Sequence, residues 1–129
     1  MIPACLPPRD VSKPKLPPPS DACDTHAHVF GPAVQFPYAD GWCWAKLSGA
    51  HRLSRDAPDY PDARPFHEAL VLANPERLVW GGDWPHPRVE GEMPDAGHLF
   101  ELFQMWTPAR RTQHRILVTN PAKLYGFPN

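Results

Sequence analysis

Residues 77–83, Arg-Leu-Val-Trp-Gly-Gly-Asp, contain the pattern that decides the fold. The apolar run from Leu78 to Trp80 stops at two glycines, which is typical of a short buried strand. Asp83 follows the glycines, so the sequence predicts a carboxylate at the C-terminal end of this strand. Active groups collect at strand C-termini in parallel α/β folds, and Asp83 is therefore a candidate active-site residue.

An earlier segment of the chain predicts a strand that carries two histidines. Residues 22–30 read Ala-Cys-Asp-Thr-His-Ala-His-Val-Phe, and we expect a strand over 23–30 that ends at a Gly-Pro turn. Side chains alternate faces along a strand, so His26 and His28 point the same way and can converge on one metal ion or one substrate atom. The alternative is two polar residues on a half-buried strand. With Asp83, these histidines supply enough groups for a hydrolytic site.

The rest of the chain predicts one more strand and several helices. Phe66, Leu70 and Ala73 recur at helical spacing, and Asn120-Pro121 is typical of a helix start. The expected elements are a strand over 42–47, a helix within 61–74, a helix from about 95, a helix from 107–108 and a short final turn over 122–125. Strands followed by helices with short connections predict an α/β fold with a parallel sheet.

Composition restricts the classes of partner and compartment. The 129 residues suffice for one domain, and a formal charge of -1 provides no basic field for nucleic acid or an anionic membrane surface. We therefore expect a small-molecule partner. Three cysteines without a CxxC pair argue against a disulfide framework and a cysteine zinc site, and no export signal or membrane span is visible. These features predict a cytoplasmic protein.

The N-terminal segment differs in composition from the rest. Seven of the 19 prolines lie within residues 1–20, which predicts extended chain without ladder pairing. We interpret residues 1–20 as a Pro-rich flexible arm and residues 21–129 as the domain. The alternative is an extended strap that packs on the domain through Leu6 and Leu16.

Five separate strings together resemble one known family. They are Asp-Thr-His-Ala-His-Val-Phe-Gly-Pro (24–32), Phe-Pro-Tyr (36–38), Lys-Leu-Ser-Gly (46–49), Trp-Gly-Gly-Asp-Trp-Pro-His (80–86) and Asn-Pro-Ala-Lys-Leu-Tyr-Gly-Phe (120–127). In this order they resemble the amidohydrolase superfamily, in the branch of 2-pyrone-4,6-dicarboxylate lactonase and related sugar-lactone and muconolactone hydrolases. The resemblance covers residues 22–129.

The resemblance implies a fold larger than this chain. The family fold is a (β/α)8 barrel of about 250 residues, so the chain is similar to a partial TIM-type barrel with an internal deletion near residues 38–44. A gene deletion and an artefact of the gene model are both open explanations. In the family, the absent middle supplies a further histidine of the site and several substrate-binding arginines.

The resemblance also implies roles for individual residues. His26 and His28 would ligate a divalent metal or, in a metal-independent form, polarise the scissile carbonyl. Asp83 would take the proton of the attacking water and complete the metal set with the two histidines. The alternative role for Asp83 is to cap the turn at Trp84-Pro85.

Three further residues are candidates for substrate binding. Arg52 and Arg88 follow the second and third expected strands, where a guanidinium can hold a substrate carboxylate, and His86 could orient Asp83 or touch the substrate. Solvated arginines and a loop histidine in contact with water are the alternatives. His51 receives no role. The other histidines are expected to be structural or exposed residues of helices, namely His67, His98 and His114.

These observations predict a lactone hydrolase in the intact form. Its substrate would be a carboxylated ring lactone, and zinc or manganese would bind weakly or not be needed, because the histidine that completes the family site is missing. The alternative is a catalytically inactive, truncated remnant that self-associates, and a homo-oligomer is compatible with both. If His51 or His86 enters the site, catalysis becomes conceivable.

Overall fold

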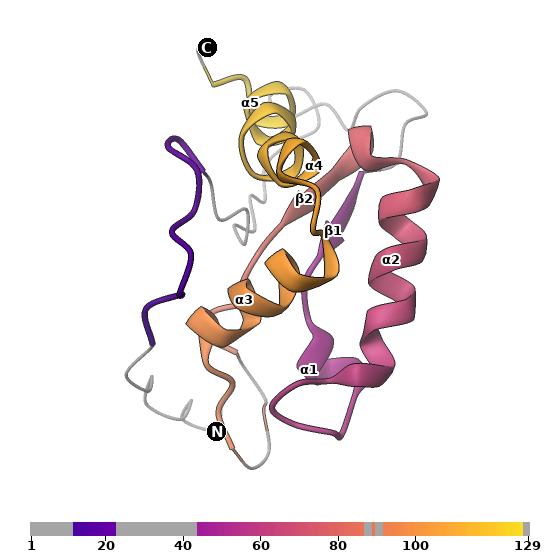
Figure 1. The fold of residues 1–129 in the computed structure, drawn as a ribbon, viewed down its shortest axis with the longest axis vertical. Helices are drawn as coiled ribbons and strands as arrows, with labels where there is room; N and C mark the ends of the chain where they lie inside the picture. The colour runs from indigo at the N-terminus through magenta and orange to yellow at the C-terminus, as the bar shows by residue number, and fades with distance from the viewer. Residues whose placement is uncertain (1–11, 23–43, 87–88, 90–91, 128–129) are drawn as a thin grey trace, which may run out of the picture.

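A computed structural model describes residues 12–22, 44–86, 89 and 92–127 of the chain. Figure 1 shows two short strands, followed or separated by helices. The elements in chain order are β1 (Ala45–Leu47), α1 (Ala50–Leu53), η1 (Pro61–Ala63), α2 (Arg64–Ala73), η2 (Pro75–Arg77), β2 (Leu78–Trp80), α3 (Ala96–Trp106), α4 (Arg110–His114), the π-helical turn η3 (Arg115–Thr119) and α5 (Asn120–Tyr125).

The two strands are parallel neighbours. Ala45 pairs with Leu78 and Leu47 with Trp80, and the intervening helices provide the long crossover that parallel pairing requires. The predicted strand over 78–80 is confirmed with the same bounds. The strand predicted over 42–47 begins at Ala45, with residues 42–43 outside the described part, and the strand predicted over 23–30 also lies outside it. The described chain is thus an α/β fold with a small parallel sheet.

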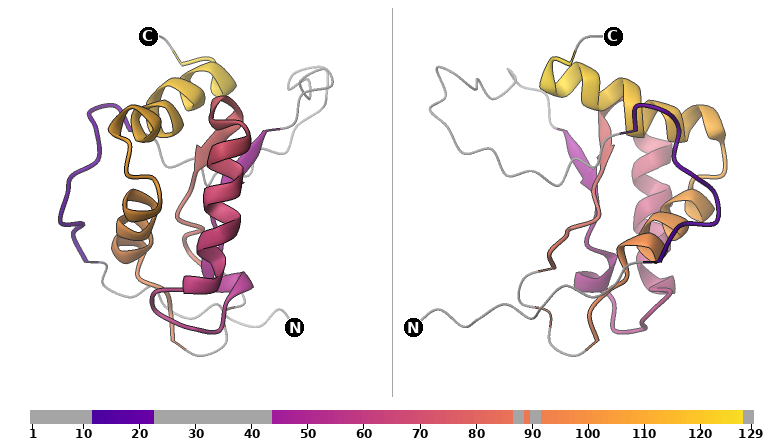
Figure 2. Two further views of the ribbon diagram at one scale, coloured as in Figure 1. Left: turned by 45° about the vertical axis from the view of Figure 1, so that its right-hand side comes forward. Right: turned by 90° about the vertical axis from the view of Figure 1, so that its left-hand side faces the viewer.

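The helices lie to one side of the two strands and supply most of the core (Figure 2). Leu47 and Trp80 from the strands pack against Phe100 and Phe103 of α3 and Leu117 of η3. The Trp80 and Phe100 rings meet edge-to-face at 5.1 Å between centroids. Each such buried side chain stabilises the fold by roughly 1.5–3 kcal/mol, so this cluster holds the ends of β1 and β2 in place.

The helix predicted within residues 61–74 is present as α2, but the apolar residues that predicted it are exposed. Phe66 is 66% exposed, and Leu70 and Ala73 are also exposed. The helix instead buries His67, whose Nε2 lies 2.7 Å from the hydroxyl of Thr107. Burial lowers the pKa of His67 to about 4, so the buried ring is neutral at pH 7. The hydroxyl of Thr107 is therefore used in the core and does not cap α4.

The short final turn predicted over 122–125 is confirmed as α5, which begins at Asn120 and ends before Gly126, but the helical backbone runs unbroken from η3 into it. Thr119 and Asn120 both keep helical backbone angles. A proline inside a helix removes an N–H and crowds the carbonyl of residue i−4, and the wider π-helical turn η3 directly before Pro121 relieves this conflict. The Asn120 amide donates to the carbonyls of Pro75 and Leu78, at 2.9 and 2.6 Å. Its side chain thus ties the helix to β2.

The described end of the N-terminal segment runs along α3. The backbone N–H of Ser12 donates to the Asp95 carboxylate at 3.1 Å, and that of Lys15 donates to Glu101 at 2.9 Å. Asp95 also caps α3, accepting from the N–H of Gly97, so this helix begins where the sequence predicted. These contacts are of the kind expected if the segment packs on the domain as an extended strap. That residues 1–20 form a flexible arm stays a prediction.

Candidate active site

The candidate site lies where the two parallel strands end. After β1, Gly49 takes a left-handed backbone conformation with φ 73° and starts the four-residue helix α1, which carries His51 and Arg52. After β2, Gly81 and Gly82 lead to Asp83. Because the strands are paired in parallel, both connections leave the sheet at the same edge, and their side chains meet.

Asp83 is the centre of this cluster. Its Oδ2 accepts a hydrogen bond from Nε of Arg52 at 2.6 Å and lies 3.1 Å from Nε2 of His51. The Asp83 and His51 side chains are buried, whereas that of Arg52 is 40% exposed. Hydrogen bonds between ions are about twice as strong as neutral ones, so Arg52 holds the carboxylate firmly from the solvent side.

A tight turn returns His86 to the same cluster. The N–H of His86 donates to the carbonyl of Asp83 at 2.7 Å. Asp83 and His86 both have left-handed backbones, with φ 60° and 53°, a conformation that costs on the order of 1–3 kcal/mol for a non-glycine residue. The His86 ring is buried, and its centroid lies 5.1 Å from that of His51. The turn uses the Asp83 carbonyl and leaves the carboxylate directed at Arg52 and His51.

Three of these residues fit a divalent metal. One ligand atom from each of His51, Asp83 and His86 lies within 4.8 Å of the other two. Burial, and then the neighbouring His86, lower the pKa of His51, although Asp83 acts in the opposite direction. A neutral imidazole is the form that binds metals. Two nitrogens and one carboxylate oxygen are a donor set that zinc accepts.

The arrangement combines the parts of a hydrolytic site. A buried carboxylate can take a proton from water, a partly exposed guanidinium can hold an anion, and neutral imidazoles can bind a metal or donate to an oxyanion. Of the predicted residues, the structure brings together Asp83, Arg52 and His86. His26, His28 and Arg88 lie outside the described residues.

Sequence reasoning did not place His51 in this cluster. The available signal was its position two residues after Gly49 at the end of a strand, next to Arg52. The other histidines behave as expected for residues of helices: His67 is buried in the core, His98 contacts Asp59 at 2.9 Å, and His114 is exposed. Their environments give them no part in the cluster around Asp83.

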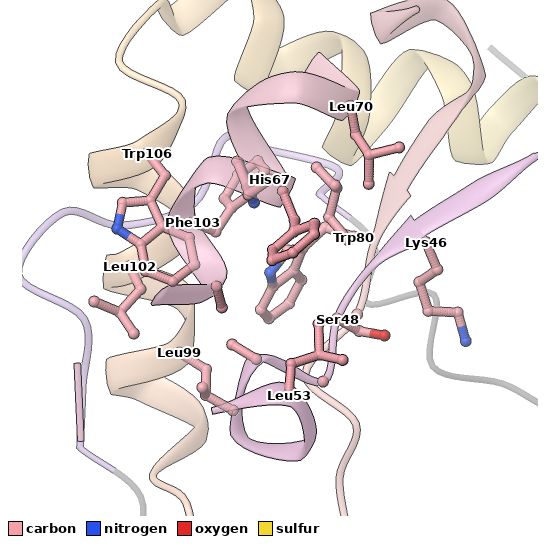
Figure 3. A pocket seen from close by; sticks show the side chains of 16 residues that line it. Lys46, Ser48, Leu53, His67, Leu70, Trp80, Leu99, Leu102, Phe103 and Trp106 are labelled. Atoms are coloured by element: carbon pink, nitrogen blue, oxygen red, sulfur yellow. The ribbon is translucent and has the colours of Figure 1, made fainter. Parts of the chain in front are cut away.

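A separate apolar cavity of about 90 Å³ lies between α1, α2 and α3. Figure 3 shows Leu53, Leu70 and Leu99 at this cavity with Trp80 and Trp106. Its lining is mostly aliphatic and aromatic and lacks any carboxylate. The described lining of the cavity thus differs in chemistry from the polar cluster around Asp83. No helix in the described part of the chain has the length and apolarity to cross a membrane.

Comparisons with known proteins agree with this geometry. Residues 39–127 match the amidohydrolase family model. The chain is 45% identical over 85 residues to a 4-sulfomuconolactone hydrolase of Rhizobium radiobacter, covering 64% of this chain and 28% of that protein. It is 38% identical over 87 residues to a D-galactarolactone isomerase of Agrobacterium fabrum, covering 66% of this chain and 30% of that protein.

A solved crystal structure also resembles this chain. A Pseudomonas putida crystal structure described as a 2-pyrone-4,6-dicarboxylic acid hydrolase superposes with a TM-score of 0.57 at 30% identity, covering 75% of this chain and 36% of that one. The chain thus spans about a third of the length of these relatives. It belongs to the amidohydrolase family, in the branch of the 2-pyrone-4,6-dicarboxylate hydrolases.

Proposed function

We infer that the site around Asp83 serves hydrolysis of a carboxylated ring lactone when the barrel is complete. One observation carries this proposal: a buried carboxylate, held by an arginine 2.6 Å away, sits at the ends of two parallel strands in a family member. Relatives that match this part of the chain are named lactone hydrolases. The proposed reaction adds water to the lactone carbonyl and breaks the ring C–O bond, giving a hydroxy acid.

Asp83 is the proposed base. It would take one proton from the attacking water while the new C–O bond forms, and would return that proton to the ring oxygen as it leaves. His26 and His28 would polarise the carbonyl, either directly or by holding a divalent metal with Asp83. Zinc or manganese, when bound there, would supply Lewis-acid stabilisation of the developing oxyanion.

Arginines would hold the substrate carboxylate. Arg52 is suited to this role because its side chain is partly exposed beside Asp83, and a guanidinium binds a carboxylate in a bidentate manner. Arg88 is proposed for the same task, and His86 for contact with the substrate or with Asp83. In the described structure Nε of Arg52 donates to Asp83, so this arginine would hold a substrate carboxylate next to the proposed base.

The fold proposed for the intact form is a (β/α)8 barrel. The chain would contribute β1, β2 and their helices, with a deletion near residues 38–44 joining them to the first strand. Since the chain spans about a third of the length of its relatives, we expect negligible lactonase activity from the chain alone.

A chimera tests the function directly. Residues 44–127 would replace the matching segment of the 4-sulfomuconolactone hydrolase, and hydrolysis of 4-sulfomuconolactone would be followed spectroscopically. We expect the chimera to be active and its Asp83→Asn version to be inactive. An active chimera whose Asp83→Asn version is equally active would contradict the role of Asp83. The isolated chain, with its own Asp83→Asn control, tests whether the shortened form has activity.

A second candidate is an inactive remnant that self-associates. The observation that favours it is the apolar surface of α1 and α2, where Leu53, Phe66, Leu70 and Leu72 are exposed. Exposed patches of large apolar residues are typical of surfaces that bind protein. Concentration-dependent sedimentation of the purified chain tests this candidate, and a monomer at all concentrations would reject it.

A further inference from the structure

We propose that His51, Asp83 and His86 form a zinc site of this chain in which the metal competes with Arg52 for the Asp83 carboxylate. This set shares only Asp83 with the set that the family resemblance implies, since it uses neither His26 nor His28. The inference does not depend on lactone hydrolysis, because metal binding is measured without substrate.

The distances are close to those of a zinc site. Nε2 of His51 and Oδ2 of Asp83 are 3.1 Å apart, and the three ligand atoms lie within 4.8 Å of one another. With zinc–ligand bonds of about 2.0–2.2 Å, two ligand atoms of a tetrahedral zinc lie about 3.4 Å apart. A modest closing of the three groups toward one point would complete the set.

Burial and hydrogen bonding also point to a ligand. The His51 side chain is 2% exposed. Its Nε2 approaches Asp83 without the alignment of a hydrogen bond, and its Nδ1 has no hydrogen-bond partner among the described residues. Buried polar atoms are nearly always bonded. A metal on one ring nitrogen would supply the interaction that this buried imidazole lacks.

Backbone elements hold the three ligand residues close together in the described structure. His51 belongs to α1, which starts at a left-handed Gly49, and His86 and Asp83 are joined by a turn with a 2.7 Å hydrogen bond. Two connections from neighbouring strand ends therefore present three donor groups to one point. A preorganised site of this kind loses little conformational entropy when it binds an ion.

The donor set selects zinc over harder ions. Calcium, magnesium and manganese prefer oxygen ligands, whereas imidazole nitrogen suits zinc. Three protein ligands leave a fourth zinc position open, as catalytic zinc sites do.

Arg52 gives the proposal its distinguishing feature. Its guanidinium donates to the same carboxylate oxygen that faces His51. A dication at this oxygen repels the guanidinium, so zinc and Arg52 compete for it. Zinc binding should displace Arg52 toward solvent, and removal of Arg52 should strengthen zinc binding.

The experiment measures metal binding by the full chain. Cobalt(II) replaces zinc as a probe, because tetrahedral cobalt with nitrogen and oxygen ligands absorbs visible light, and zinc affinity follows from competition with a chromophoric chelator. His51→Gln and His86→Gln should each weaken zinc binding by about 100-fold or more, since loss of an outer-shell partner alone costs 10–100-fold. The matched control, His98→Gln with His114→Gln, changes two histidines outside the cluster and should leave both the spectrum and the affinity unchanged.

Arg52→Met supplies the second test. It should strengthen zinc binding by about tenfold or more, because the competing charge is gone while the apolar stem remains. Weaker binding in Arg52→Met, or retention of binding in His51→Gln together with its loss in the double variant His26→Gln/His28→Gln, would overturn the proposal. Circular dichroism of each variant checks folding. If His51→Gln fails to fold, His86→Gln and Arg52→Met decide the question.

Discussion

The C-terminal ends of β1 and β2 bury polar side chains, whereas the outer face of α1 and α2 exposes apolar ones. At the strand ends, charged and polar groups are buried and contact one another around Asp83. On the helix face, Leu53, Phe66 and Leu70 are exposed around an apolar cavity (Figure 3). Folded domains normally bury large apolar side chains and expose charged ones. A buried polar cluster at the ends of parallel strands is where active groups of such folds collect, whereas the described residues leave the face of α1 and α2 apolar and exposed.

The largest effect is expected from Asp83→Asn in the active chimera. The amide keeps the shape of the carboxylate but cannot accept a proton, so kcat should fall by about 10²–10⁴-fold. Initial rates at saturating 4-sulfomuconolactone measure the change. Asp95→Asn, a carboxylate that caps α3 away from the strand ends, is the matched control and should keep its rate. Comparable losses in both variants would mean that the strand-end cluster has no special role.

A smaller effect is expected from pH on the buried His67. Burial lowers its pKa from 6.5 to about 4, so below pH 6.5 the unfolded chain binds a proton that the folded chain does not. The free energy of unfolding should therefore fall as the pH decreases from 6.5 toward 4, by about 2–3 kcal/mol.

Urea unfolding at pH 7 and pH 4.5 measures this loss. His67→Gln keeps a hydrogen-bonding group for Thr107 without a titratable ring and should lose less stability over the same interval. An identical pH dependence in the wild type and His67→Gln would assign the loss to other groups.

The exposed helix face should control self-association. Phe66→Ser combined with Leu70→Ser should weaken association by about tenfold or more while changing the free energy of unfolding by less than about 1 kcal/mol, because both side chains are exposed. Met105→Ser is the matched control, since Met105 is similarly exposed but lies on α3 outside this face. Sedimentation velocity over a range of concentrations measures association. Equal weakening by both sets of substitutions would show that the α2 face is not special.

The smallest effect is expected from removal of residues 1–20. The described part of this segment contacts α3 and its N-cap through surface interactions: the N–H groups of Ser12 and Lys15 donate to carboxylates, and the Leu16 carbonyl accepts from the Gln104 amide. Such exposed hydrogen bonds contribute little to stability. A chain that starts at Asp21 should keep a cooperative unfolding transition within about 1 kcal/mol of the full chain. Loss of that transition would identify the segment as a structural strap.

Much of the fold follows from local pattern. The apolar run before two glycines predicted β2 with its observed bounds, and the Asp95 cap with its apolar period predicted α3. Asp83 and Arg52 follow β2 and β1 as predicted and contact each other, and His86 lies beside Asp83, while the proposed roles of all three stay predictions. These predictions succeeded because short-range sterics, capping and burial of both faces determine such elements.

Other features depend on contacts distant in sequence. Helical periodicity in α2 identified a helix but not its buried side, which His67 occupies through its contact with Thr107. Asn120-Pro121 has the local form of a helix start, yet the bonds from Asn120 to Pro75 and Leu78 keep it inside a continuous helix. Local propensity is weak next to several buried contacts of this kind.

The sequence by itself determined the family, through five strings in a fixed order, and the carboxylate at the end of β2, through an apolar run that stops at two glycines. The alternation of strands and helices along the chain also predicted the parallel α/β arrangement. Only the tertiary structure decided that His51 joins Asp83. That contact arises from a left-handed Gly49, a short helix and a turn that contribute from two strand ends. Convergence of side chains from separate segments depends on how strands pair in space, and no single segment of sequence encodes it.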